Sequence, residues 1–349
     1  MIRKIASLVA ATTFAMVASA HHSFEPHFDV KKPVNISGKV TQFEARNPHS
    51  YLHIAAVDES GRTQEYICES HGVTQLTRNG ITPAMLKPGT ELRIDGSQSR
   101  NDVHRCFFNN VYFPDGRALN VNGPKGAPAP QPGQPVAAAR KDIFGTWLLA
   151  PIPGRLTAGP QPMINSLTDA GKAAVAKYNP FKDDPAFRCD PVAVRRVWGA
   201  PGTPLSISRE KDRVILRHEW MDVQRTVYLD QHEHPKNGKR TSLGHSIGHF
   251  EGDTLVIETA NYAAGVLNQY VEMPGQPTRG LLHSAALTTV ERVHLDAARQ
   301  RLVVEFMLKD PDFFTRDFDP STLEFAPSEL KLEPFNCSPE GVDGAIHKK

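Results

Sequence analysis

Apolar and polar residues alternate along much of the chain, and a period of two predicts β-strands with one buried face. In the first third, the pattern predicts a short helix at 73–78 and strands at 34–43, 51–57, 63–68, 86–96 and 107–113. Three strands, a helix and two further strands follow one another in the order of an OB-fold. We therefore predict an OB-like small barrel, which implies no particular function because OB-folds serve many.

A second run of alternating segments lies in the last 150 residues. Strands are predicted at 204–208, 213–219, 225–230, 246–250, 253–259, 287–295 and 301–308. A helix is predicted through 170–178, with Thr168 as its N-cap and Asn179-Pro180 as its stop. Successive hairpins favour an antiparallel barrel or a strongly curved sheet, with a β-sandwich as the alternative. The opening Gly145-Thr146-Trp147 resembles lipocalin-like proteins, so the expected fold is mainly β, with a lipocalin-like second domain and minor helix.

Two segments without this alternation divide the chain. Arg3 and Lys4 precede an uncharged apolar run that ends at Ala18-Ser19-Ala20, the layout of a cleavable secretory signal. Five prolines within 123–139 indicate a semi-rigid linker. The expected organisation is a signal peptide at 1–20, an OB-like domain at 21–122, a linker at 123–142 and a lipocalin-like domain at 143–349.

Net charge and cysteine content indicate which partners and which cellular compartment to expect. Removing Arg3 and Lys4 from the 40 Lys and Arg leaves 38, which balance the 38 Asp and Glu, so a nucleic-acid partner is not expected. No later apolar stretch is long enough to span a membrane. The four cysteines, two in each half and none in a CxxC pair, favour one disulfide per domain in an oxidising compartment. We therefore expect Cys68–Cys106 and Cys189–Cys337, in a periplasmic or secreted protein.

Three motifs make the chain resemble a family of uncharacterised bacterial exported proteins. They are His21-His22-Ser23-Phe24, Asn47-Pro48-His49-Ser50 and the stretch from Gly244 to Leu255, in which Phe250 stands where the family is expected to carry Trp. The resemblance implies exported domains of a family without established activity. It therefore assigns no catalytic residue.

The predicted cleavage after Ala20 would leave His21 at the mature N-terminus. The α-amine and ring of an N-terminal histidine, joined by a second histidine, form a nitrogen-rich site suited to Cu(II). His22 lies nearby, and His49 is the expected partner, since His53 lies about 13 Å further along the same strand. A solvated, unstructured chain end is the alternative interpretation.

Polar residues of the second domain suggest a ligand pocket. Trp147, Arg225, Tyr228, His245 and His249 are candidates to line it as polar anchors among apolar walls. His232-x-His234 and His245-x-x-x-His249-x-Glu251 also have zinc-like spacing. However, the first motif is predicted to be a hairpin-loop tip and the second a strand, which lacks the helical spacing of such zinc sites.

Recognised catalytic signatures are absent from the sequence, including a nucleophile elbow, a P-loop and a dinucleotide-binding glycine motif. We therefore expect a periplasmic binding or accessory protein, with copper at the mature N-terminus and a small apolar molecule in the second domain. The alternative is a secreted enzyme with its site in the second domain, because catalytic groups converge in space rather than in sequence.

Overall fold

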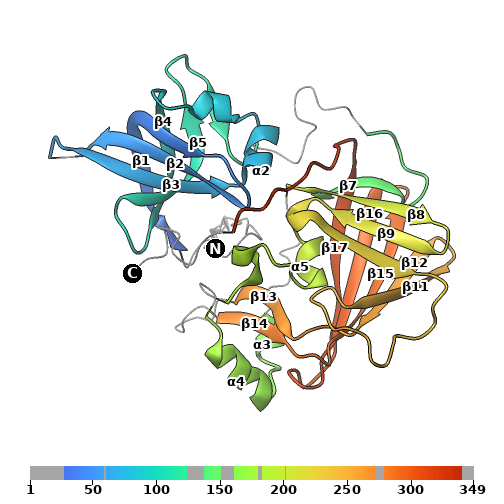
Figure 1. Cartoon of the computed structure of the whole chain (residues 1–349). Helices are drawn as coiled ribbons and strands as arrows, with labels where there is room; N and C mark the ends of the chain where they lie inside the picture. The colour runs from blue at the N-terminus through green and yellow to red at the C-terminus, as the bar shows by residue number, and fades with distance from the viewer. Residues whose placement is uncertain are drawn as a thin grey trace, which may run out of the picture.

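The computed structural model of the protein describes residues 27–58, 60–123, 137–150, 161–179, 183–200, 202–271 and 279–339. The protein is mainly β and contains two β-units, each built around its own hydrophobic core (Figure 1). No helix among these residues is long and apolar enough to cross a membrane. The predicted signal peptide and most of the predicted linker lie outside the described residues.

The N-terminal unit is a small barrel with one α-helix. Its elements are β1 (Phe28–Glu44), β2 (His49–Val57), β3 (Thr63–His71), α2 (Val73–Arg78), η1 (Pro83–Leu86), β4 (Glu91–Ser99), β5 (Arg105–Tyr112) and β6 (Ala118–Asn120). β1 pairs with β2 and β4, and β3 pairs in parallel with β5, so the ring closes in the order β1-β2-β3-β5-β4. This strand order, with a helix between β3 and β4, confirms the predicted OB-like fold.

Alternation along the strands accounts for the core of this unit. Leu52 and Ile54 of β2 and Ile94 of β4 are fully buried, and each lies two residues from another inward-facing position. Cys68 on β3 and Cys106 on β5 face each other in the parallel register and form the predicted disulfide. The bond therefore joins the two strands whose pairing closes the ring.

The C-terminal unit is a closed barrel of nine strands. They are β7 (Gly145–Ala150), β8 (Pro204–Glu210), β9 (Arg213–His218), β10 (Val223–Tyr228), β11 (His245–Glu251), β12 (Thr254–Ala260), β15 (Thr288–Asp296), β16 (Arg301–Lys309) and β17 (Phe318–Ser328). Neighbours in the ring follow chain order, and β17 closes it against β7. The predicted barrel is thus confirmed, with every predicted strand present. It differs from the eight-stranded lipocalin pattern in strand number.

One pair of strands in this barrel is parallel. A ring with an odd number of strands cannot alternate in direction throughout, so nine strands require at least one parallel neighbour pair. That pair is β10 and β11, which meet only at Val227–Ser246 and Tyr228–Ile247. The expectation of a wholly antiparallel barrel was therefore wrong at this junction, which we call the seam.

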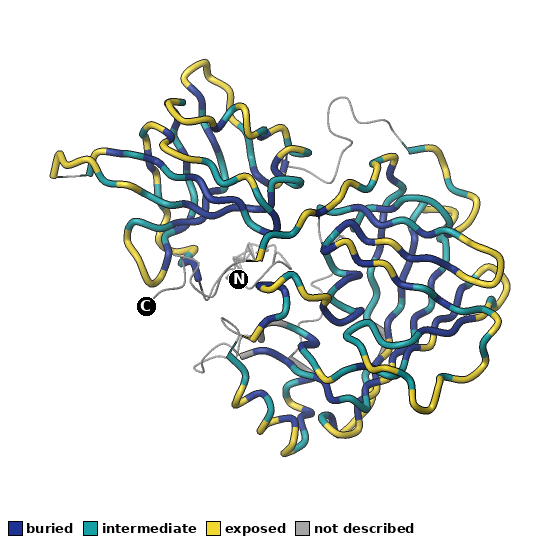
Figure 2. Tube along the Cα trace, in the orientation of Figure 1, coloured by how far each residue is buried: buried dark blue, intermediate teal, exposed yellow. Residues whose placement is uncertain are grey.

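Several short elements are not strands of the ring. They are the β13–β14 hairpin (Gly265–Val271 and Arg279–His283) and the helices α3 (Gln161–Ile164), α4 (Asp169–Lys177), η2 (Pro185–Arg188), α5 (Val194–Trp198) and η3 (Trp220–Asp222). The side chain of Thr168 accepts a hydrogen bond from the backbone N–H of Gly171 and caps α4, as predicted. The side chains of Trp147, Trp198 and Phe325 help to fill the barrel core. In Figure 2, the barrel strands are largely buried or intermediate, and the turns between them are exposed.

A C-terminal segment connects the two units. Residues 329–339 run from the barrel towards the N-terminal unit, where the backbone N–H of Ser338 donates to the carbonyl of Asn47 (Figure 1). The predicted Cys189–Cys337 disulfide is present and holds this segment to the barrel unit. Arg78 of α2 forms a two-pronged ion pair with Glu219, whose side chain is fully buried.

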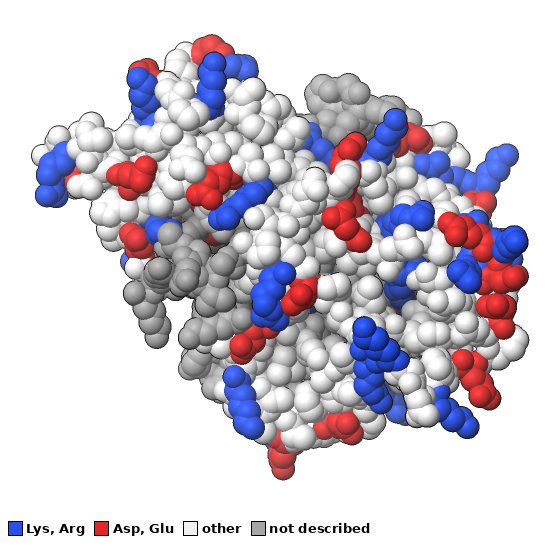
Figure 3. All heavy atoms as spheres, viewed as in Figure 1, with Lys and Arg blue, Asp and Glu red and all other residues white. Residues whose placement is uncertain are grey.

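On the face shown in Figure 3, acidic and basic side chains are interspersed, which agrees with the balanced net charge.

Trp147→Ala tests whether the barrel core carries the stability of the C-terminal unit. The side chain is fully buried, so its removal should lower the free energy of unfolding by about 3–5 kcal/mol. Met307→Ala is the matched control, because Met307 is 38% exposed on the same barrel and should change stability by about 0.5 kcal/mol or less. Urea unfolding followed by circular dichroism measures both. Similar losses in the two variants would contradict the assignment.

Candidate functional site

Two groups of histidines stand out once the fold is known. The first is the β2–β3 histidine pair, His49 and His71, which lie directly opposite each other in the antiparallel register. Directly opposed residues project from the same face of a sheet. His49 is two residues from Tyr51 on the face opposite Leu52 and Ile54, so this pair faces away from the barrel core. Its side chains are nevertheless shielded: that of His49 is 11% exposed, and His71 is buried.

Neighbouring oxygen atoms orient both rings of this pair. Nε2 of His71 lies 2.8 Å from Oδ1 of Asn122, an acceptor, so Nε2 carries the proton and the ring lone pair is on Nδ1. Nδ1 of His49 lies 3.3 Å from a carboxylate oxygen of Glu69, which is an ion-pair distance without hydrogen-bond geometry. Hydrogen bonding of the non-ligating nitrogen is typical of histidines that bind metals.

Burial also keeps His71 neutral. Loss of water lowers the pKa of His71 to about 4, against the effect of the Asn122 hydrogen bond and with a smaller contribution from His49. The neutral imidazole is the form that binds metal ions. At neutral pH, His71 is therefore in its ligating state without losing a proton.

The first described residues lie beside this pair. The ring of Phe28, at the start of β1, is 5.6 Å from the ring of Phe107, and the His71 ring is 5.5 Å from the same phenyl group. His27 is buried at this position. His21 and His22 lie outside the described residues. Five residues separate His21 from His27, and the six steps between them span at most about 20 Å.

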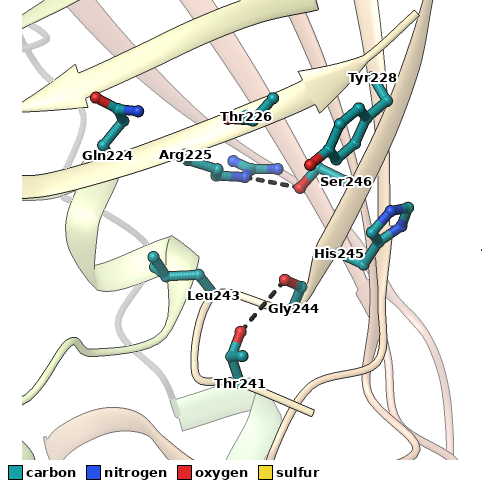
Figure 4. A pocket seen from close by; sticks show the side chains of 9 residues that line it. All are labelled: Gln224, Arg225, Thr226, Tyr228, Thr241, Leu243, Gly244, His245 and Ser246. Atoms are coloured by element: carbon teal, nitrogen blue, oxygen red, sulfur yellow. Dashed lines mark hydrogen bonds between the residues drawn. The ribbon is translucent and has the colours of Figure 1, made fainter. Parts of the chain in front are cut away.

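The second group surrounds a hollow of about 200 Å³ at the seam. Its walls are Gln224, Arg225, Thr226, Tyr228, Thr241, Leu243, Gly244, His245 and Ser246 (Figure 4). β10 forms one side of the hollow and the approach to β11 forms the other. Because these strands pair at only two positions, they separate below Val227 and leave this space. Most of its lining is polar, unlike the apolar walls that the sequence predicted.

Arg225 joins the seam to the barrel interior. Its guanidinium forms a two-pronged pair with Glu291 on β15, at 2.6 and 2.8 Å, and donates to Ser246 on β11 and Thr259 on β12. Trp198 donates to the same carboxylate at 2.6 Å. Burial by itself would lower the pKa of Arg225. The charge and hydrogen bonds of Glu291 together have the larger effect, so the pKa of Arg225 is raised. Arg225 therefore lines the hollow, but its charge is already paired with Glu291 and is not available to a ligand.

Three of the predicted pocket residues come together and two do not. Arg225, Tyr228 and His245 line the hollow, where the Tyr228 ring stacks on the His245 ring at 5.2 Å. Trp147 is in the core and donates from Nε1 to the carbonyl of Ile143. His249 is exposed and lies 3.3 Å from Glu251, so the predicted His245/His249 spacing does not form a shared site.

Sequence reasoning missed one histidine that the fold makes important and misplaced another. His71 was overlooked because the predicted third strand ended at residue 68, whereas β3 continues to His71. His234 was expected at a hairpin tip, but its segment is the crossover from β10 to β11, and its Nδ1 lies 3.0 Å from Nδ1 of His245. Among the described residues, no group of three or more His, Cys, Asp or Glu is placed to hold a metal ion.

Comparison with known proteins gives a partial match. Residues 9–107 match a family of unknown function (DUF6152), which is consistent with the uncharacterised family suggested by the sequence motifs. The matched range includes His21, His49 and His71 and ends in β5, so it leaves the nine-stranded barrel outside. No curated protein and no solved structure matches the chain.

Acid should weaken the barrel through His218, a buried residue whose ring packs edge-on against Trp198. Burial, followed by the positive charge of Arg225, lowers the pKa of His218 to about 3. Below about pH 6.5 the unfolded chain binds a proton that the folded chain excludes, so stability is fully present above that pH and falls as pH is lowered towards 3. Between pH 7 and pH 5 this residue should remove about 2 kcal/mol from the free energy of unfolding.

His218→Phe isolates this effect, because it keeps an aromatic ring and removes the titrating group. Its free energy of unfolding should fall less steeply between pH 7 and pH 5 than that of the unmodified protein, as measured by urea unfolding at each pH. Equal slopes in the two proteins would show that His218 is not the buried titrating group.

Proposed function

We propose that the protein is an exported copper-binding accessory protein whose Cu(II) site is on the N-terminal unit. The ligands are the α-amine and ring of His21 after signal cleavage, together with His49 and His71. The observation that carries the proposal is the shielded His49–His71 pair, oriented by Glu69 and Asn122 beside the start of β1. Amine and imidazole nitrogens in a tetragonal arrangement suit Cu(II).

The compartment supports this proposal. Both disulfides fit a protein that folds in an oxidising environment, such as the periplasm. The sequence before His21 has the features of a secretory signal, and cleavage after Ala20 would create the free α-amine. The site therefore becomes complete only after export, where the protein would meet copper outside the cytoplasm.

The barrel offers a different type of binding surface. Large side chains, including Trp147 and Trp198, occupy its core, so a guest molecule would bind at the seam hollow rather than along the barrel axis. The polar lining of this hollow favours a polar guest over the apolar one expected from the sequence. Binding of an apolar molecule, and the alternative of a secreted enzyme, remain predictions without a specific contact to support them.

Copper titration of chains with different N-termini tests the proposal. A chain that starts at His21 should bind one Cu(II) at this site with a nitrogen-rich tetragonal electron paramagnetic resonance signal. A chain whose His21 α-amine is acetylated should lose that signal, because the blocked amine can no longer bind the metal ion. A retained tag should have the same effect.

Three substitutions refine this test. His49→Ala and His71→Ala should each weaken binding at least about tenfold, and Asn122→Ala should weaken it by about 10–100-fold because Asn122 orients His71. Asn122 is exposed, so its loss should leave the core intact. His232→Ala is the control and should have no effect. Equal affinity of the acetylated and free-amine chains would contradict the proposal.

A further inference from the structure

The crossover segment 229–244 brings a second histidine to the seam. Parallel strands cannot be joined by a tight hairpin, so these 16 residues must travel along the barrel between the end of β10 and the start of β11. The segment is held in place where Arg240 donates to the carbonyl of Tyr262 and Asn261 donates to the carbonyl of Pro235. His234 is thereby fixed against His245, the first residue of β11.

Nδ1 of His234 and Nδ1 of His245 are 3.0 Å apart, with the two rings nearly perpendicular at 84°. Two imidazole nitrogens that bind one metal ion at about 2.0–2.1 Å each are about 3 Å apart when the angle at the metal is close to 90°. A tetrahedral angle would need a separation of about 3.3–3.4 Å. The observed spacing therefore fits adjacent positions of a tetragonal or octahedral ion.

The pair lies beside an aromatic ring and the hollow, whose wall also includes Arg225. Tyr228 stacks on His245 and fixes the plane of its ring. The adjoining hollow leaves space for water or another ligand.

Gly244 is needed to place His245. Its φ of +65° lies in the left-handed region, and a Cβ there would be 2.6 Å from the carbonyl oxygen of Ala260. Only glycine allows the crossover to turn into β11 this close to β12. The histidine pair is thus built into the connection that the odd number of strands requires.

We propose that His234 and His245 form a second metal site, a two-histidine site for a divalent transition-metal ion with tetragonal or octahedral preference, Cu(II) or Ni(II). Solvent molecules in the hollow complete its coordination. The site goes beyond the proposed function, because it is in the barrel unit and needs neither His21 nor signal cleavage. Imidazole pairs suit both ions, and affinity should follow the general order in which Cu(II) exceeds Ni(II).

The test uses a chain whose His21 α-amine is acetylated, so that the N-terminal amine cannot bind, and titrates it with Cu(II) alone and with Ni(II) alone. Binding of Cu(II) at one equivalent should give a paramagnetic resonance signal with coupling from two nitrogen atoms. His234→Gln and His245→Gln should each weaken binding at least tenfold and remove that coupling. His232→Gln, two residues away on the same crossover, and His249→Gln, on the same strand as His245, should bind as the unmodified chain does.

Two results would overturn the proposal. One is unchanged copper and nickel binding in both His234→Gln and His245→Gln while their melting temperatures fall, which would make the pair a structural hydrogen bond. The other is equal weakening by His232→Gln, which would indicate unspecific binding along the crossover. Failure of the N-terminal site is distinguishable, since it would appear as identical binding by the free-amine and acetylated chains.

Discussion

The odd number of strands in the C-terminal barrel is the constraint on which the rest of that unit depends. Nine strands cannot close with every neighbour antiparallel, so one pair must be parallel, and a parallel pair needs a long connection. The protein meets this requirement at β10 and β11, which pair at two positions and are joined by residues 229–244. The short pairing opens the hollow, and the long connection carries His234 to its rim. Both features follow from how the ring closes.

Because β10 and β11 pair at only two positions, other interactions must hold the seam together, and Arg225 provides several of them. From β10 its guanidinium reaches Ser246 on β11, Thr259 on β12 and Glu291 on β15, so side-chain hydrogen bonds cross the seam where backbone bonds are few. A buried ion pair often contributes little net stability, because both groups lose their hydration. Here each partner is satisfied several times over, and Trp198 also donates to Glu291. The network therefore fixes which strands meet at the seam, in addition to neutralising a buried charge.

Local pattern predicted the strands and the disulfides, whereas the sites depend on relations between distant segments. Alternation identified β2 because Leu52 and Ile54 need one buried face, and Thr168 was recognisable as a cap from its position alone. β17 was missed because Pro320 and Pro327 interrupt its pattern, whereas the strand runs from Phe318 to Ser328 through both. The importance of His71 appears only from the register that places it opposite His49. That of His234 appears only once β10 and β11 are known to be parallel, a property that no local pattern contains.

The two histidine pairs arise from different structural causes, and this difference separates their proposed roles. His49 and His71 meet through the register of adjacent antiparallel strands, and they need a third group from the processed N-terminus to complete a strong nitrogen-rich site. His234 and His245 meet through the crossover, so their site exists in any chain whose barrel has closed. Two imidazoles beside solvent bind a metal ion less firmly than a site that adds an amine and a further ring. The two proposals together therefore predict retention of copper at the N-terminal unit and exchangeable binding at the seam.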